Sequence, residues 1–268
     1  MEAYVELYKD SIEILYHLAY IKYFEENDTP KKIPREEAIV GGNLVRLIKL
    51  SISYLENVCN GKTEICLILN RCIAETYINL KFILVNGEEN VKRNYIKNSL
   101  ITEKELWEVI KTNVSERSEE ALNIEKRMQK SIENSFETSD FEIDDVNRSS
   151  KWKSIKNRAE AIAGDQFYTI FYGIGSHAVH GNWQDILTNN LNKFEDGFKL
   201  NLNWYRPRPQ MMDAAIVFNA DILRTYLEHE LSSYPDLEIL KTNHNVILDY
   251  ERLLTESHEN FLQSQNGL

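Results

Sequence analysis

The sequence has few residues that interrupt helices. Its 268 residues include only 10 glycines and 5 prolines, so long uninterrupted elements are expected. Cysteine is also scarce, and Cys59, Cys66 and Cys72 have neither the spacing of zinc ligands nor that of a redox pair. We therefore expect three reduced thiols in the core rather than a disulfide framework or a metal centre.

Basic residues are outnumbered by acidic ones. The chain has 31 lysines and arginines against 42 aspartates and glutamates, a formal net charge of -11. We expect no broad face for duplex nucleic acid, because such a face needs clustered lysine and arginine. A small RNA-cleaving pocket remains compatible with this net charge.

Long hydrophobic runs are absent. The most apolar stretch, residues 65–85, includes Arg71, Glu75 and Lys81, and charges near its middle argue against a membrane span. The first residues lack the basic segment and the apolar core of a signal peptide. These absences predict a soluble, cytoplasmic protein with no membrane contact.

Apolar residues recur at helical spacing through most of the chain. The predicted helices cover about residues 3–25, 34–60, 62–85, 88–136 with one break near Thr102, 150–163, 165–180, 210–231 and 237–263. Residues 137–146 are acidic and predict a loop. Residues 191–204 alternate around Asp196-Gly197 and predict a small hairpin.

These elements predict an all-α fold, a single helical-bundle domain of about eight to nine helices with a small β-hairpin insert. Within the domain 1–268, residues 1–61 form an N-terminal helical hairpin. Residues 62–231 form the core with the candidate site, and residues 232–268 form a C-terminal helix.

A charged pair lies inside an apolar helix. The segment 62–85 is apolar nearly all round, so it should be central and buried, with Arg71 and Glu75 one turn apart within it. Removing one partner of a buried pair costs about 3–5 kcal/mol. Two interpretations stay open: a structural clamp that ties neighbouring helices, or a guanidinium held by the carboxylate and presented to an anionic ligand.

A narrow polar stripe marks a second helix. On a helical wheel for residues 165–180, one side is apolar and the other carries a glycine among polar side chains. Glycine permits close approach of a backbone or a ligand. The stripe consists of Gln166, Thr169, Gly173, Ser176, His177 and His180, flanked by Tyr168 and Tyr172.

Three chemistries are open to this stripe. Ser176 and His180 have the spacing of a nucleophile and its base, but no acid is placed to orient the histidine. His177 and His180 could share a metal, but no carboxylate stands at a matching position. Acid/base work by His180 beside Arg71 is favoured, because histidine titrates near neutrality and arginine stabilises phosphate charge.

The candidate site follows from that choice. Its catalytic residues are His180, Arg71 and Glu75, and its binding residues are Gln166, Tyr172, Ser176 and His177. We expect no cofactor and no metal.

The spacing of these residues resembles that of a known family. Arg71-x-x-x-Glu75 is followed by Tyr168-x-x-x-Tyr172-x-x-x-Ser176-x-x-x-His180-Gly181, with Trp152 and Arg158-Ala159-Glu160 before the second motif. Over about residues 44–231 these motifs resemble an uncharacterised family of bacterial helical proteins, a domain of unknown function. The resemblance implies a helical fold and no established activity.

A looser likeness is to the HEPN superfamily of helical ribonucleases and toxins, common in bacterial toxin–antitoxin and phage-defence systems. Its signature is an arginine and a histidine a few residues apart on one helix. His180 fits the histidine, whereas the arginine would come from another helix, as Arg71. The likeness implies an RNA-cleaving effector in which Arg71 binds phosphate, Glu75 orients Arg71 and His180 is the general acid/base.

A second class of function stays open beside the enzyme. The same pocket would serve a non-catalytic helical binding or sensor module, with a structural Arg71–Glu75 pair. The partners expected are RNA or a small anionic ligand. The charged segment 103–136, expected to be helical, is the best place for a homodimer contact or a helical protein partner.

Overall fold

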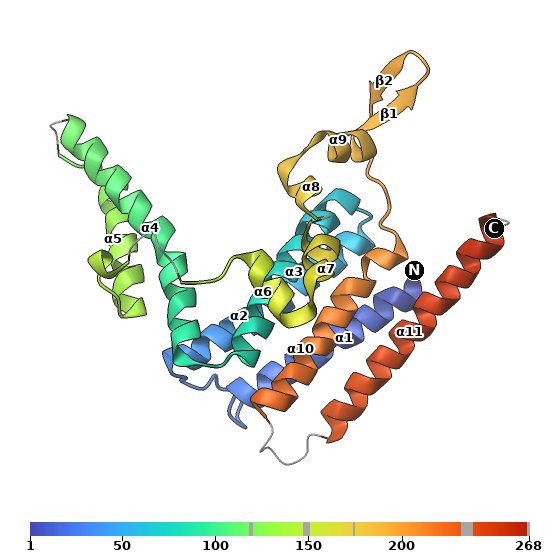
Figure 1. The fold of residues 1–268 in the computed structure, drawn as a ribbon, viewed down its shortest axis with the longest axis horizontal. Coiled ribbons are helices and arrows are strands. Elements are labelled where there is room, and N and C mark those ends of the chain that lie inside the picture. The colour runs from blue at the N-terminus through green and yellow to red at the C-terminus, as the bar shows by residue number, and fades with distance from the viewer. Residues whose placement is uncertain (118–119, 147–150, 174, 232–237, 267–268) are drawn as a thin grey trace. The chain divides into compact units, whose positions relative to one another are not determined.

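The computed structural model describes residues 1–117, 120–146, 151–173, 175–231 and 238–266. Within these residues it contains eleven α-helices and one two-stranded antiparallel hairpin (Figure 1). The predicted all-α class with a small hairpin is confirmed.

The helices are α1 (Glu2–Tyr23), α2 (Arg35–Cys59), α3 (Thr63–Val85), α4 (Glu89–Arg117), α5 (Asn123–Ser139), α6 (Ile155–Ala163), α7 (Asp165–Phe167), α8 (Ser176–His180), α9 (Trp183–Asn189), α10 (Asp213–His229) and α11 (Glu238–Asn266). The strands are β1 (Leu191–Phe194) and β2 (Gly197–Leu200). Short 3-10 turns cover Ile143–Asp145 and Pro209–Met211, and a π-helical segment covers Tyr168–Gly173.

The chain divides into two compact units. The larger comprises residues 1–33, 40–85 and 155–268, and the smaller comprises residues 34–39 and 86–154. The single domain expected from the sequence stays a prediction.

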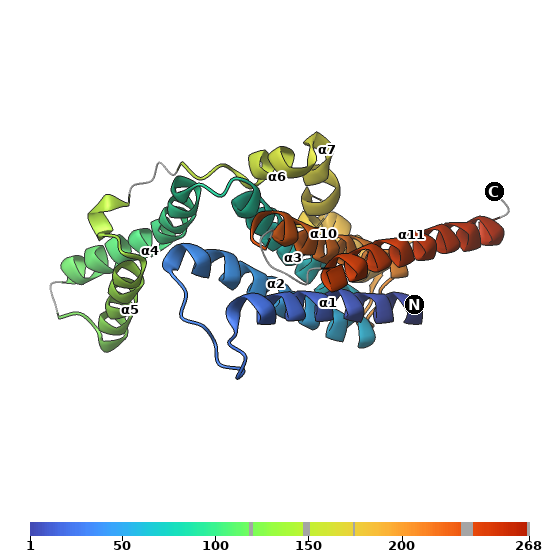
Figure 2. The same ribbon diagram turned by 90° about the horizontal axis from the view of Figure 1, so that it is seen from below.

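Helix α10 forms the centre of the larger unit. It packs against α1, α3 and α11, and the two views show α1 and α11 running beside it (Figures 1 and 2). The core contains Leu15, Leu44, Ile73, Ile78, Phe218 and Tyr226, all nearly inaccessible to solvent. Gly41 lets α2 approach α1, because a β-carbon there would lie 3.0 Å from Cζ of Tyr23.

A polar network joins α3 to α10. The Nζ of Lys81 lies 2.6 Å from Oδ2 of Asp221, and the hydroxyl of Tyr77 donates to the same oxygen over 2.7 Å. Burial acts to raise the pKa of Asp221, but its hydrogen bonds to these two side chains and to Arg224 outweigh that effect and hold the pKa below its usual value. The sequence pattern gave no sign of this network.

The smaller unit is built on α4 and α5. The two helices pack together over a core of Leu100, Ile110, Ile132, Phe136, Phe141 and Val146. The predicted break near Thr102 is wrong, since α4 continues to Arg117. The segment 103–136, expected to be helical throughout, is divided between two helices, because α4 ends at Arg117 and α5 begins at Asn123. Glu125 fixes that start by accepting hydrogen bonds from the Leu122 amide and the Arg117 guanidinium.

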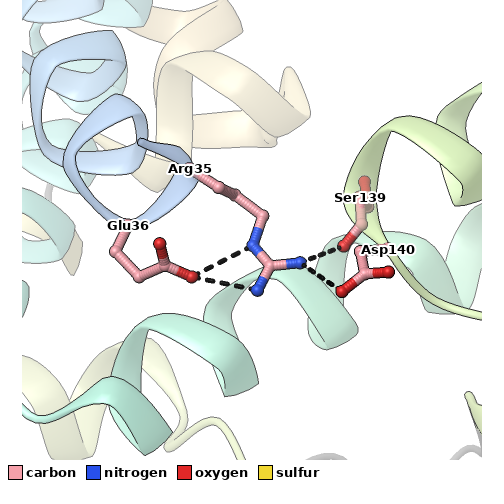
Figure 3. Close-up of polar contacts among 4 residues, drawn as sticks. All are labelled: Arg35, Glu36, Ser139 and Asp140. Atoms are coloured by element: carbon pink, nitrogen blue, oxygen red, sulfur yellow. Dashed lines mark hydrogen bonds and ion pairs between the residues drawn. The ribbon is translucent and has the colours of Figure 1, made fainter. Parts of the chain in front are cut away.

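Arg35 organises the start of α2 within this unit (Figure 3). Its Nη1 donates to the Ser139 carbonyl over 2.9 Å and to Asp140 Oδ2 over 3.3 Å, while Nη2 donates to Glu36 over 2.9 Å. Asp140 ends α5 in the left-handed conformation, with φ of 58°. The acidic loop predicted for 137–146 is thus shorter than expected, because α5 extends to Ser139 and a 3-10 turn follows.

The three cysteines differ in exposure. Cys66 is buried, and burial raises the pKa of its thiol to about 11, but Cys72 is half-buried and Cys59 is exposed. The prediction of three core thiols therefore holds for Cys66 alone. Cys59 is the last residue of α2, where the chain turns back toward α3 through Gly61.

One described helix, α2, is long and apolar enough to cross a membrane by length and composition. Half of its most apolar window is buried inside the protein. Core helices of water-soluble proteins pass the same test, so the signal for a membrane span is weak.

Candidate functional site

The predicted helix 165–180 is not continuous. It consists of the three-residue α7, the π-helical segment Tyr168–Gly173 and the five-residue α8. The wider π winding changes the rotation per residue, so an α-helical wheel does not describe which residues of this segment share a face. The rings of Phe167 and Phe171 pack 4.9 Å apart and both contact Phe218 of α10, which anchors the segment on the core.

Tyr172 links the two charged residues of α3. The guanidinium carbon of Arg71 lies 4.2 Å from the centroid of the Tyr172 ring, and Nη2 donates to the Tyr172 hydroxyl over 2.9 Å. That hydroxyl donates to Oε2 of Glu75 over 3.4 Å. Burial raises the pKa of the Tyr172 hydroxyl, and the Glu75 carboxylate adds to the rise. The three side chains form one connected cluster.

The expected deep burial of the charged pair is wrong. Tyr172 is 7% exposed, but Arg71 is half-buried and Glu75 is exposed. This face of α3 is covered by the short pieces α6 and α8 and the π-helical segment rather than by one long helix. In this cluster the Tyr172 ring is buried, whereas the charged groups of Arg71 and Glu75 reach the surface.

Gly175 brings the start of α8 onto Arg71. A β-carbon on Gly175 would lie 2.9 Å from the β-carbon of Arg71, closer than real side chains allow. By contrast, a β-carbon on Gly173 would meet only an ordinary contact, 3.5 Å from the Tyr168 carbonyl oxygen. The close approach expected at Gly173 thus occurs at Gly175 instead.

Both histidines of α8 are exposed. Nδ1 of His177 is hydrogen-bonded to the side-chain amide of Asn182, whose carbonyl oxygen also caps α9 by accepting from the Asp185 amide. Within the described part of the chain, His180 has no hydrogen-bond or ion-pair partner, and so none to Arg71, Glu75 or Tyr172.

The remaining predicted residues contribute less to the cluster. Gln166 is exposed on α7 and makes no hydrogen bond to the described residues. The Ser176 side chain and Ile174 lie outside the described residues. Across the described ranges, no group of three or more histidine, cysteine, aspartate or glutamate side chains is arranged to hold a metal ion.

Comparison with known proteins identifies the family. No curated protein and no solved structure matches the chain. A family model matches residues 37–198, which are more than half of the chain and include Arg71, Tyr172 and His180. The chain therefore belongs to the family described as a family of unknown function, DUF5677.

Proposed function

We propose that the protein is a HEPN-like helical effector that cleaves RNA, with Arg71 as the phosphate-binding residue and His180 as the general acid/base. The observation that carries this proposal is the contact between Gly175 and Arg71, because it brings the helix that holds His180 against the arginine. Its substrate would be cytoplasmic RNA, in the setting of a toxin–antitoxin or phage-defence system.

The dimensions of α8 support the pairing. The helix begins at the residue after Gly175 and ends at His180. At about 1.5 Å of rise per residue, His180 lies within about 8 Å of Gly175 along the helix axis. In the proposed complex, the Arg71 and His180 side chains contact the same phosphodiester of the RNA.

The chemistry assigns a separate task to each residue. The Tyr172 ring and hydroxyl fix the guanidinium of Arg71, which binds the phosphate and stabilises the negative charge that develops on it. The ribose 2′-oxygen attacks the phosphorus and the bond to the 5′-oxygen breaks, giving a 2′,3′-cyclic phosphate and a 5′-hydroxyl. The imidazole of His180 takes the proton from the 2′-hydroxyl as the new bond forms, and the resulting imidazolium gives that proton to the 5′-oxygen as the old bond breaks.

One observation favours a second candidate, a non-catalytic module that binds a small anion. A general base is commonly oriented by a hydrogen bond to a second group, and His180 has none within the described part of the chain. In that case Arg71 and Tyr172 alone form the binding site, and His180 has no part in it.

Induced expression in bacterial cells separates the two. We expect the parent protein to arrest growth and fragment cellular RNA, and His180→Ala to abolish both effects while expressing at the same level. His177→Ala is the matched control from the same short helix and should retain most of the effect. Intact RNA with the parent protein, together with a melting temperature raised by inorganic phosphate, would instead support the anion-binding module.

A further inference from the structure

Exposed aromatic rings gather just beyond His180. Trp183 opens α9, and the hairpin of β1 and β2 follows it, with Phe194 and Phe198 on its strands. Trp183 is 58% exposed and Phe198 is 48% exposed. A contiguous group of exposed apolar side chains on a protein surface often marks an interaction site, and this group follows the proposed site directly along the chain.

Trp183 and Phe198 form a corner. Their ring centroids lie 5.7 Å apart and their planes are at 87°. A flat ligand stacked on one ring is therefore perpendicular to the other ring and turns its own edge toward it. We call this pair the aromatic corner.

The hairpin places a lysine on the same side as the corner. Phe198 pairs with Lys193 across the two strands, and paired residues share one face of a hairpin. The opposite face carries Phe194, whose ring is covered by the ammonium group of Lys199 at 4.4 Å from the centroid. The Phe194 ring is thus covered by a cation, whereas the Trp183 and Phe198 rings contact each other and each keeps about half of its surface exposed.

The local charge differs from that of the whole protein. In the hairpin segment, residues 191–200, two basic side chains (Lys193, Lys199) balance two acidic ones (Glu195, Asp196), whereas the chain as a whole has 31 against 42. Two exposed aromatic rings with Lys193 on the same face of the hairpin match a ligand that carries flat rings and phosphates. Single-stranded nucleic acid has both.

We propose that the aromatic corner is a base-stacking subsite for single-stranded RNA, with Lys193 contacting the phosphate backbone. This inference rests on the proposed function and names the form of its substrate. Trp183 follows His180 by three residues, so their α-carbons lie within about 11 Å of one another. A base held on Trp183 brings a neighbouring phosphodiester toward His180. Duplex RNA is excluded from the corner, because its bases are already stacked and paired.

Binding is measured apart from cleavage by using the full chain with His180→Ala. The probe is a fluorescein-labelled oligouridine of about ten nucleotides, followed by fluorescence anisotropy. We expect Trp183→Ala to weaken binding about tenfold and Phe198→Ala to weaken it by a smaller factor. Trp183→Phe, which keeps a stacking ring, should retain most of the affinity, and Phe194→Ala is the matched control from the other face.

The outcomes distinguish this inference from the proposed function. Oligouridine binding that depends on Trp183, without cleavage by the unmutated chain, supports the subsite and defeats the ribonuclease. If the unmutated chain cleaves RNA but Trp183→Ala and Phe198→Ala leave the affinity for oligouridine unchanged, the subsite is overturned and the ribonuclease stands. Equal affinity of the protein for the single-stranded oligomer and for its duplex also overturns the subsite. So does a Trp183→Ala variant that binds RNA normally but no longer self-associates.

Discussion

The backbone of Gly175 lies directly on the side chain of Arg71, where a β-carbon would come within 2.9 Å of the arginine's own β-carbon. Gly175 has an ordinary right-handed conformation, with φ of -64°. The glycine is therefore required by the contact between two segments and not by its backbone angles.

Gly175→Ala should force α8 away from α3. We expect a loss of about 1–3 kcal/mol in the free energy of unfolding, as for other overpacked sites, measured by urea denaturation. The control is Gly42→Ala in α2, where a β-carbon would meet no described atom within 4 Å. That change should be neutral or stabilise by up to about 1 kcal/mol. Equal stability of the two variants would contradict the close contact.

Tyr172→Phe removes the hydroxyl that bridges Arg71 and Glu75 and keeps the ring beneath the guanidinium. We expect a loss of about 1–3 kcal/mol, because the hydroxyl bonds to charged groups. A double-mutant cycle with Arg71→Met should give a coupling energy of about 1 kcal/mol or more. A coupling near zero would show that the two side chains act independently in solution.

Asp213 makes stability depend on pH. Burial raises the pKa of this carboxyl to about 7, and the charges of Glu251 and Glu259 on α11 add to the rise. The folded chain therefore holds a proton that the unfolded chain releases near pH 4, so this carboxyl lowers stability as pH rises from about 4 to about 7.

Urea denaturation from pH 5 to pH 8 checks that sign. The free energy of unfolding should fall with rising pH in the parent and fall less in Asp213→Asn, which cannot ionise. Glu251, whose pKa is also raised by burial, supplies part of the remaining slope. The same slope in both proteins would show that Asp213 is solvated.

Much of the fold could be predicted because its signals are local. Helix α2 ends at Cys59, one residue before the predicted limit, and Gly61 follows at φ of +69°. Asp196-Gly197 lies at the turn of the hairpin, as predicted. Apolar periodicity located α1 and α10 to within a few residues. Helix ends, turns and amphipathic helices are determined by residues that are close together in the chain, so a single sequence is enough to predict where they occur.

The site depended on contacts that no local pattern encodes. The π-helical winding of Tyr168–Gly173 accompanies packing of Phe167 and Phe171 on Phe218 of another helix. The pairing of Arg71 with Tyr172 likewise joins residues 101 positions apart. The helical pattern predicts the Arg71–Glu75 pair and, on another helix, Tyr172, but not the contact that joins them. It also predicts deeper burial of the pair than is found, and a close approach at Gly173 instead of Gly175.

The most direct test is cleavage of a single-stranded RNA oligomer by the purified chain, with the product ends identified by mass spectrometry. We expect a 2′,3′-cyclic phosphate and a 5′-hydroxyl, formed equally well in EDTA, at a rate that changes with pH near neutrality. His180→Ala and Arg71→Met should each abolish the product while keeping a helical circular dichroism spectrum. An oligomer that stays intact with the parent chain, or is cut as fast by His180→Ala, would contradict the proposed ribonuclease.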